Sequence, residues 1–326
     1  MRSSRYALSV GLLLISALLI SGCSSLPANS GVVNVVKNRA AQYATTGNQF
    51  YARGEYEQAL KLFQLARDTN LSIDDREGAV TSYNSIGKTL LALGNLDAAE
   101  VSFKTSIDLS QQLDNPALEI ESETNLAELY LGEQPAGGSD PTGTALTMLE
   151  AIAAKPVTAA TRGAMAIAYH DLGTALARKA DYVPALAYLQ MALQINSDLK
   201  RSVETASNHY MIASIYSRQG NSPDALKQIL LALEFDKKAE NSGGIASDLA
   251  AAGDISEKSG GNAAAYGYFG RALEVYETAG IPSGVEPTLQ RLIPLAKLLS
   301  RTEDLKGYEE LLAKLKSASS PQERAK

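Results

Sequence analysis

Residues 47–66 read GNQFYARGEYEQALKLFQLA, and this stretch decides the fold. Small residues stand at Gly47, Ala59 and Ala66, and a large aromatic residue, Phe63, follows the central alanine by four positions. Spacings of three, four and seven residues put side chains on one face of an α-helix. Gly54 interrupts the pattern, and a glycine can end a helix in the left-handed conformation. The stretch therefore predicts two short antiparallel helices that pack closely through their small residues.

The same arrangement recurs along the chain. The central alanine is repeated at spacings of 40, 46, 40, 40 and 40 residues, and a large apolar residue follows each copy by four positions. One helix pair cannot bury its apolar face alone, so neighbouring pairs stack into a solenoid. We expect the pairs to be held together at Gly47, Ala59, Phe63, Gly87, Ala99, Phe103, Ala145, Gly173, Ala185, Ala225, Ala265 and Phe269.

These residues resemble the pattern of the tetratricopeptide repeat, a helix pair with small and aromatic residues at fixed positions. The resemblance covers residues 39–284 with a period of 40 residues, as in the long-repeat variant of the family. It implies an all-α fold, a right-handed α-solenoid of about six helix pairs. Residues 285–316 lack the small-residue pattern and predict a capping helix pair at the C-terminus, followed by a flexible tail over 317–326.

The single spacing of 46 residues places six extra residues in the third unit, around Gly132–Gly143. This stretch is rich in glycine and proline and predicts a loop between the two helices of that unit. We interpret it as a surface insertion. A lid over a small-molecule ligand is the alternative.

Residues 1–22 have the features of a signal peptide. Arg2 and Arg5 precede an apolar run from Ala7 to Ile20, which at ~1.5 Å per residue is too short to cross a bilayer core of ~30 Å. The run ends in Ile20-Ser-Gly-Cys23, which resembles the lipobox of bacterial lipoproteins. The resemblance implies lipidation of Cys23, the only cysteine of the chain.

Residues 23–38 then form the lipidated tether and the lead-in to the first helix. In Gram-negative lipoproteins, a serine after the cysteine, here Ser24, implies an anchor in the outer membrane with the body of the protein facing the periplasm. In a Gram-positive cell, the same anchor would place the protein outside the plasma membrane. We therefore expect a lipid-anchored protein of the cell envelope.

The composition argues against several functional classes. The 326 residues carry a net charge of −6, whereas binding to nucleic acid requires a basic surface. His170 and His209 are the only histidines and have no evident third ligand beside them, so we expect neither a metal site nor a cofactor. Phosphate-binding loops and nucleophile elbows are also missing from the sequence. We therefore do not expect an enzyme.

In tetratricopeptide repeat proteins, the first helices of the pairs line a concave groove, which binds a partner peptide or helix. The resemblance implies the same role for polar and aromatic residues on these helices. Ala44 stands where some relatives bind a terminal carboxylate, so we do not expect that mode. The candidate groove residues are Asn48, Tyr51, Asn84, Lys88, Asn125, Glu128, His170, Arg178, Tyr210 and Arg218.

The sequence thus favours a membrane-anchored, periplasmic scaffold or adaptor for protein–protein interaction. Its partner would be a protein of an envelope complex, of the pilus, outer-membrane or peptidoglycan type. Two alternatives stay open, namely a self-associating structural lipoprotein and a solenoid that binds a small molecule or lipid.

Overall fold

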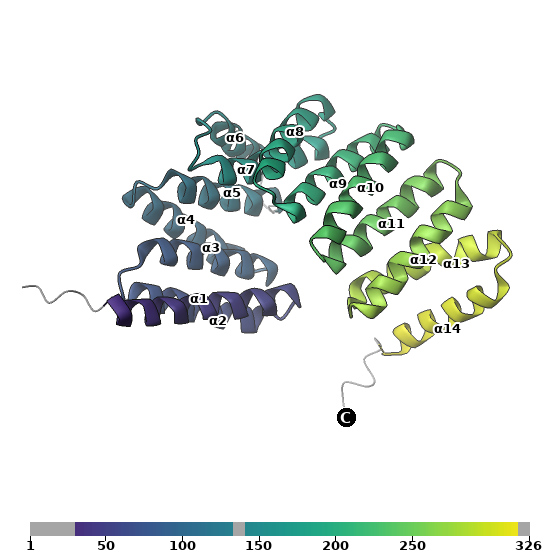
Figure 1. Cartoon of the computed structure of the whole chain (residues 1–326), viewed down its shortest axis with the longest axis horizontal. Coiled ribbons are helices and arrows are strands. Elements are labelled where there is room, and N and C mark those ends of the chain that lie inside the picture. Colours follow the sequence, from purple (N-terminus) through teal and green to yellow (C-terminus); the bar gives the residue numbers. More distant parts are fainter. Residues whose placement is uncertain (1–29, 133–140, 319–326) are drawn as a thin grey trace, which may run out of the picture.

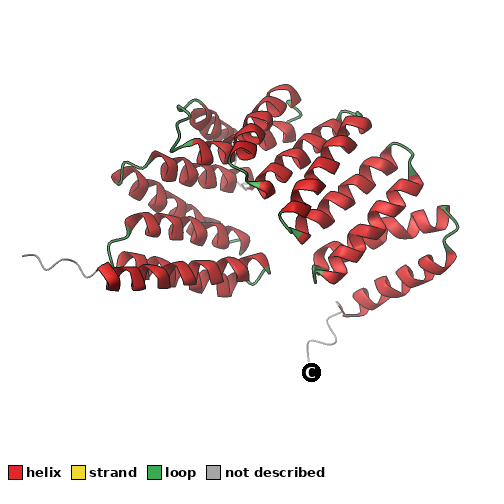
Figure 2. Ribbon diagram, in the orientation of Figure 1, coloured by secondary structure: helices red, strands yellow, loops and turns green. Residues whose placement is uncertain are grey.

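The computed structural model describes residues 30–132 and 141–318, and over these ranges the chain consists of helices joined by turns, without strands (Figure 2). Consecutive helices form antiparallel pairs, as expected for an all-α solenoid. The first helices of the pairs are α1 (Ser30–Ala52), α3 (Arg76–Ala92), α5 (Pro116–Gly132), α7 (Arg162–Arg178), α9 (Ser202–Arg218), α11 (Ser242–Lys258) and α13 (Pro282–Leu298). The second helices are α2 (Tyr56–Leu71), α4 (Leu96–Gln112), α6 (Pro141–Ala153), α8 (Tyr182–Asp198), α10 (Ser222–Lys238), α12 (Asn262–Thr278) and α14 (Thr302–Ala318).

The 40-residue period consists of two similar halves, each a helix of mostly 17 residues and a short turn. Most of the described turns contain a residue in the left-handed conformation, such as Gly94 with φ of 76°. The backbone N–H of Asn95 then donates to the carbonyl oxygen of Leu90 at 2.9 Å. This bond satisfies one of the free carbonyl groups at the helix end and reverses the chain direction.

The small residues allow the two helices of a pair to approach closely. A methyl group added at Gly47 would lie 2.7 Å from the ring of Phe63, so only glycine fits against this ring. Gly173 is in similar contact with Leu189, and Gly253 with Phe269. The central alanines have no exposed surface; they are Ala59, Ala99, Ala145, Ala185, Ala225 and Ala265.

Several boundaries differ from those expected. Helix α1 begins at Ser30, so residues 30–38 belong to the first helix and not to a lead-in. The terminal pair extends over 282–318 instead of 285–316, because Pro282 occupies the first helical position, where no N–H is needed. The signal peptide, Cys23 and most of the predicted tail lie outside the described residues.

The third unit contains the insertion. Helix α5 ends at Gly132 and α6 begins at Pro141, and residues 133–140 lie outside the described part of the chain. Helix α6 has only 13 residues and ends at Ala153, shortly before Pro156. A proline disfavours the helical conformation of the residue before it, so the helix ends early.

The helix pairs follow one another around an arc, with α1 and α2 at one end and α13 and α14 at the other (Figure 1). Each second helix packs against the first helix of the next unit. The first helices also contact one another from α3 through α5, α7, α9 and α11 to α13. Because this closer packing is found among the first helices, they form the inner side of the arc.

Candidate binding groove

The inner side of the arc presents a stripe of exposed and half-buried residues along each first helix. On α9 this stripe includes Val203, Ser207 and Tyr210, at helical spacings of three and four residues. Tyr210 is 37% exposed, so its ring is open to a ligand on this face. We call the surface formed by these stripes the groove.

Asn48 and Tyr51 lie near the end of α1. Asn48 is exposed, and Tyr51 is 36% exposed with its ring edge-on to Tyr56 at 5.2 Å between centroids. Burial raises the pKa of Tyr51, and the charges of Tyr56 and Glu128 add to this shift. Tyr51 is therefore a neutral aromatic residue with a hydroxyl group at neutral pH.

The centre of the groove contains a cluster of charged residues from three units. Burial raises the pKa of Asp171 to about 7, and the negative charge of Glu128 adds to this shift. The positive charges of Lys88 and Arg178 oppose it. Three predicted groove residues, from α3, α5 and α7, thus interact electrostatically with Asp171. The sequence analysis missed Asp171 because its own helix gives no sign of the charges that neighbouring units bring to it.

His170 is half-buried between α7 and α9. Its Nδ1 donates to Asn208 Oδ1 at 2.9 Å, and Ser207 Oγ lies 3.5 Å from its Nε2. A small pocket of about 80 Å³ adjoins these side chains. Burial lowers the pKa of His170, so the ring is neutral at pH 7.

The two histidines have separate partners. His209 Nδ1 donates to Gln228 Oε1 at 2.7 Å, and its ring stacks on Phe235 at 5.7 Å. Within the described residues, no group of three histidine, cysteine or acidic side chains has the arrangement of a metal site.

Two of the predicted groove residues are buried instead. Asn84 and Asn125 are each 2% exposed, so neither reaches the surface of the groove. Asn84 Nδ2 donates to Ser122 Oγ at 3.1 Å and joins α3 to α5. The prediction of peptide contacts at Asn84 and Asn125 is therefore wrong, because adjacent first helices pack over these positions.

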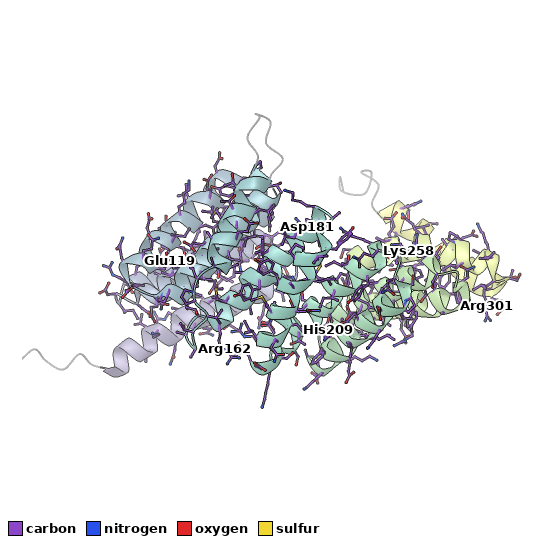
Figure 3. All side chains as sticks on the ribbon, turned by 90° about the horizontal axis from the view of Figure 1, so that it is seen from above. Glu119, Arg162, Asp181, His209, Lys258 and Arg301 are labelled. Atoms are coloured by element: carbon purple, nitrogen blue, oxygen red, sulfur yellow. The ribbon has the colours of Figure 1, made fainter. Side chains whose placement is uncertain are left out.

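A pocket of about 250 Å³ opens between α9 and α11. Tyr210 and Arg218, both predicted groove residues, lie on its wall. The other polar lining residues are Ser214, Ser217, Asp254 and Lys258. Figure 3 shows all side chains of the array, with His209 and Lys258 labelled in its C-terminal half.

The repeat pattern itself identifies the family. The family model described as "Tetratricopeptide repeat" matches residues 41–112 and 164–238. The chain is a tetratricopeptide repeat protein. No curated protein sequence matches it.

Solved structures share the fold of this tetratricopeptide repeat protein at low sequence identity. The apo form of the quorum sensor NprR from B. thuringiensis is 16% identical, with a TM-score of 0.60 over 88% of this chain and 79% of NprR. The apo form of RapI is 14% identical, with a TM-score of 0.63 over 88% of this chain and 77% of RapI. A Rap protein complexed with competence and sporulation factor is 13% identical, with a TM-score of 0.56 over 83% of this chain and 80% of that protein.

None of the helices described in this tetratricopeptide repeat protein is long and apolar enough to cross a membrane. The first helices that form the groove carry polar, aromatic and charged side chains on their inner stripes. Such a surface can bind a peptide through hydrogen bonds to its backbone and through contacts with its side chains.

Proposed function

We propose that this tetratricopeptide repeat protein is a scaffold that binds an extended or helical segment of a partner protein in its groove. The observation that carries the proposal is the pocket of about 250 Å³ on the inner side of the arc, between α9 and α11. Its exposed tyrosine and its polar groups have the composition expected of a protein-binding surface. The Rap protein with bound factor is a precedent within the same fold.

We further propose that a lipid on Cys23 anchors the scaffold to the envelope, in the outer membrane and facing the periplasm. The support comes from the sequence, namely the apolar run, the Ile20-Ser-Gly-Cys23 motif and the single cysteine. A lipid-anchored scaffold with this orientation would help to assemble or regulate an envelope complex.

The groove is tested by charge reversal and crosslinking in intact cells, followed by purification and mass spectrometry. The groove variant carries Lys88→Glu and Arg218→Glu. The control carries Lys61→Glu and Lys227→Glu on the exposed faces of second helices, so its net charge changes equally. We expect the wild type and the control to crosslink to a defined envelope protein. The groove variant should lose this crosslink. Recovery of the protein alone, or equal recovery with all three, would contradict the groove as the binding surface.

The anchor is tested separately by the Cys23→Ser variant. Each buried methylene of a lipid contributes ~0.8 kcal/mol to membrane binding, so loss of the acyl chains should release the protein into the soluble periplasmic fraction. Fractionation and intact-mass measurement follow the change. A Cys23→Ser protein that stays in the membrane, or a wild type without added lipid mass, would refute the lipoprotein assignment.

A further inference from the structure

The pocket between α9 and α11 adjoins a position of the first helices that holds a large residue in the first three units and a small one in α9. The penultimate residue of the first helix is Tyr51 in α1, Leu91 in α3 and Leu131 in α5. In α7 and α9 it is Ala177 and Ser217. Ser217 lines the hollow together with apolar residues that include Ile229 of α10.

Two cationic side chains line this hollow. Arg218 and Lys258 are the last residues of α9 and α11. Arg218 Nη1 donates to the carbonyl oxygen of Ala177 at 3.3 Å, and Lys258 Nζ donates to Ser217 Oγ at 3.5 Å. Both contacts are long and are made to neutral acceptors. Neither cation is ion-paired with a carboxylate of the described chain.

The nearby carboxylates are bonded elsewhere. Arg291 of α13 contacts Asp254 Oδ1 at 2.9 Å and Glu257 Oε2 at 2.6 Å. These contacts draw both carboxylates toward α13 and leave Arg218 and Lys258 with donor groups for a ligand. Because Asp254 also lines the pocket, the site suits a single negative charge better than the double charge of a phosphate.

The remaining groups of the pocket are hydroxyls. Ser214 and Ser217 can donate or accept hydrogen bonds. Tyr210 keeps its proton at neutral pH, because burial and the carboxylates of Asp248 and Asp254 raise its pKa. Two cations and three hydroxyl donors around a small hollow match the acceptor oxygens of a carboxylate.

The size and place of the pocket limit the ligand further. A volume of about 250 Å³ is below that of pockets that enclose a whole drug-sized ligand, so it accommodates one side chain. The groove continues on both sides, through α7 toward α1 and through α13. A bound segment would therefore run past the pocket and not end in it.

We propose that this pocket binds the side-chain carboxylate of an aspartate or glutamate within the partner segment. The inference rests on the proposed function, since it assigns a chemical preference to the same groove. Arg218 and Lys258 supply the charge, Tyr210 and the two serines supply further hydrogen bonds, and Ile229 contacts the methylene groups.

The test uses random 12-residue peptides displayed on phage through their C-termini, so that no library peptide has a free terminal carboxylate. The library is selected against the full protein, against Arg218→Glu/Lys258→Glu and against Lys61→Glu/Lys227→Glu. The wild type and the control should enrich peptides with a conserved aspartate or glutamate. The double pocket variant should enrich lysine or arginine instead, a reversal that a merely structural role at the helix ends would not produce.

A selected peptide is then synthesised and its affinity measured by fluorescence polarisation. Replacing its conserved acidic residue by the corresponding amide should weaken binding about 10- to 100-fold, as expected for a hydrogen bond to a charged group. Amidation of its C-terminus should have no effect. Enriched peptides without an acidic residue, or loss of binding on amidation, would overturn the inference and leave the scaffold proposal standing. No enrichment over the blank support would overturn both.

Discussion

At the residue scale, glycine and phenylalanine are matched across the helices of a pair. A methyl group at Gly87 would lie 2.7 Å from Cδ1 of the fully buried Phe103. In the third unit, Ala127 replaces the glycine and the smaller Leu149 replaces the phenylalanine. Each of the three phenylalanines at this repeat position thus faces a glycine, whereas a leucine faces either an alanine, as here, or a glycine, as Leu189 faces Gly173.

This match predicts the effect of Gly87→Ala. In an open helix, alanine is more favourable than glycine by ~0.5–1 kcal/mol. Here overpacking against Phe103 should outweigh this gain and lower the free energy of unfolding by ~1–3 kcal/mol. Urea unfolding measures the change, and Gly87→Ala/Phe103→Leu should recover most of it. Gly267→Ala, at an exposed helical site with no neighbour in reach, should be stabilising. A stabilising Gly87→Ala would contradict the match.

A buried pair of acidic residues joins the fifth unit to the sixth. Asp236 and Asp248 are 5% and 2% exposed, and Asn241 Nδ2 donates to Asp236 Oδ1 at 2.9 Å. Burial, together with the Asp236 carboxyl group, raises the pKa of Asp248 to about 8. Burial also raises the pKa of Asp236. The pair therefore retains a proton at neutral pH, whereas the unfolded chain does not.

The sign of the pH dependence follows from this proton. Because the folded state binds it more tightly, the contribution of Asp248 to stability is greatest below about pH 4 and is lost as the pH rises to about 8. The thermal midpoint of the wild type should fall as the pH rises from about 5 to about 8. Asp248→Asn should make this fall smaller. Asn208 occupies the equivalent place one unit earlier, so the amide should fit. The exposed Asp108→Asn is the control. A pH profile that Asp248→Asn leaves unchanged would contradict the shared proton.

At the element scale, the described turns inside the helix pairs share a left-handed backbone conformation, but the residue that adopts it is not always glycine. The turn inside most pairs has a left-handed glycine, such as Gly220 with φ of 77°. The fourth unit has Ala180 in its place, with φ of 62°. Its N–H and that of Asp181 still bond to the preceding turn, at 3.2 and 3.0 Å. The fourth unit therefore keeps the turn, although the left-handed backbone conformation is unfavourable for an alanine.

Ala180→Gly should remove this cost and raise the free energy of unfolding by ~0.5–1 kcal/mol, the left-handed penalty less the entropy of glycine. Gly220→Ala should have the opposite effect of similar size. Both sites are exposed, so packing changes little. Thermal unfolding measures the change in stability of the two variants. Changes of the same sign would show that the backbone conformation does not decide the outcome.

The helix pairs were predictable from the sequence because Gly47, Ala59 and Phe63 recur in register. The turns between pairs were harder to place, because Lys200 and Glu240 are left-handed without being glycines. The start of α1 was also missed. Residues 30–38 lack the small-residue pattern on which the prediction of the helices depends.

At the scale of the whole molecule, the sequence predicted which helix of each pair faces the groove but not how adjacent units fill it. Tyr210 and Arg218 line the pocket, whereas Asn84 is covered where α3 packs on α5. Burial and the charge of Glu128 from a neighbouring unit raise the pKa of Asp171, whereas Lys88 of another unit and Arg178 of its own helix oppose the shift. Such properties depend on the stacking of units, which the repeat pattern of one unit does not contain.

The central claim is that the groove is the surface that binds a partner. Its most direct test is photocrosslinking in the cells that make the protein, with a benzophenone amino acid placed at one position at a time. Ser214 lies in the pocket of the groove, and Val183 is 82% exposed on a second helix. Ser214 should crosslink to a defined partner protein, whereas Val183 should not. Crosslinks to that partner from Val183 and none from Ser214 would contradict it.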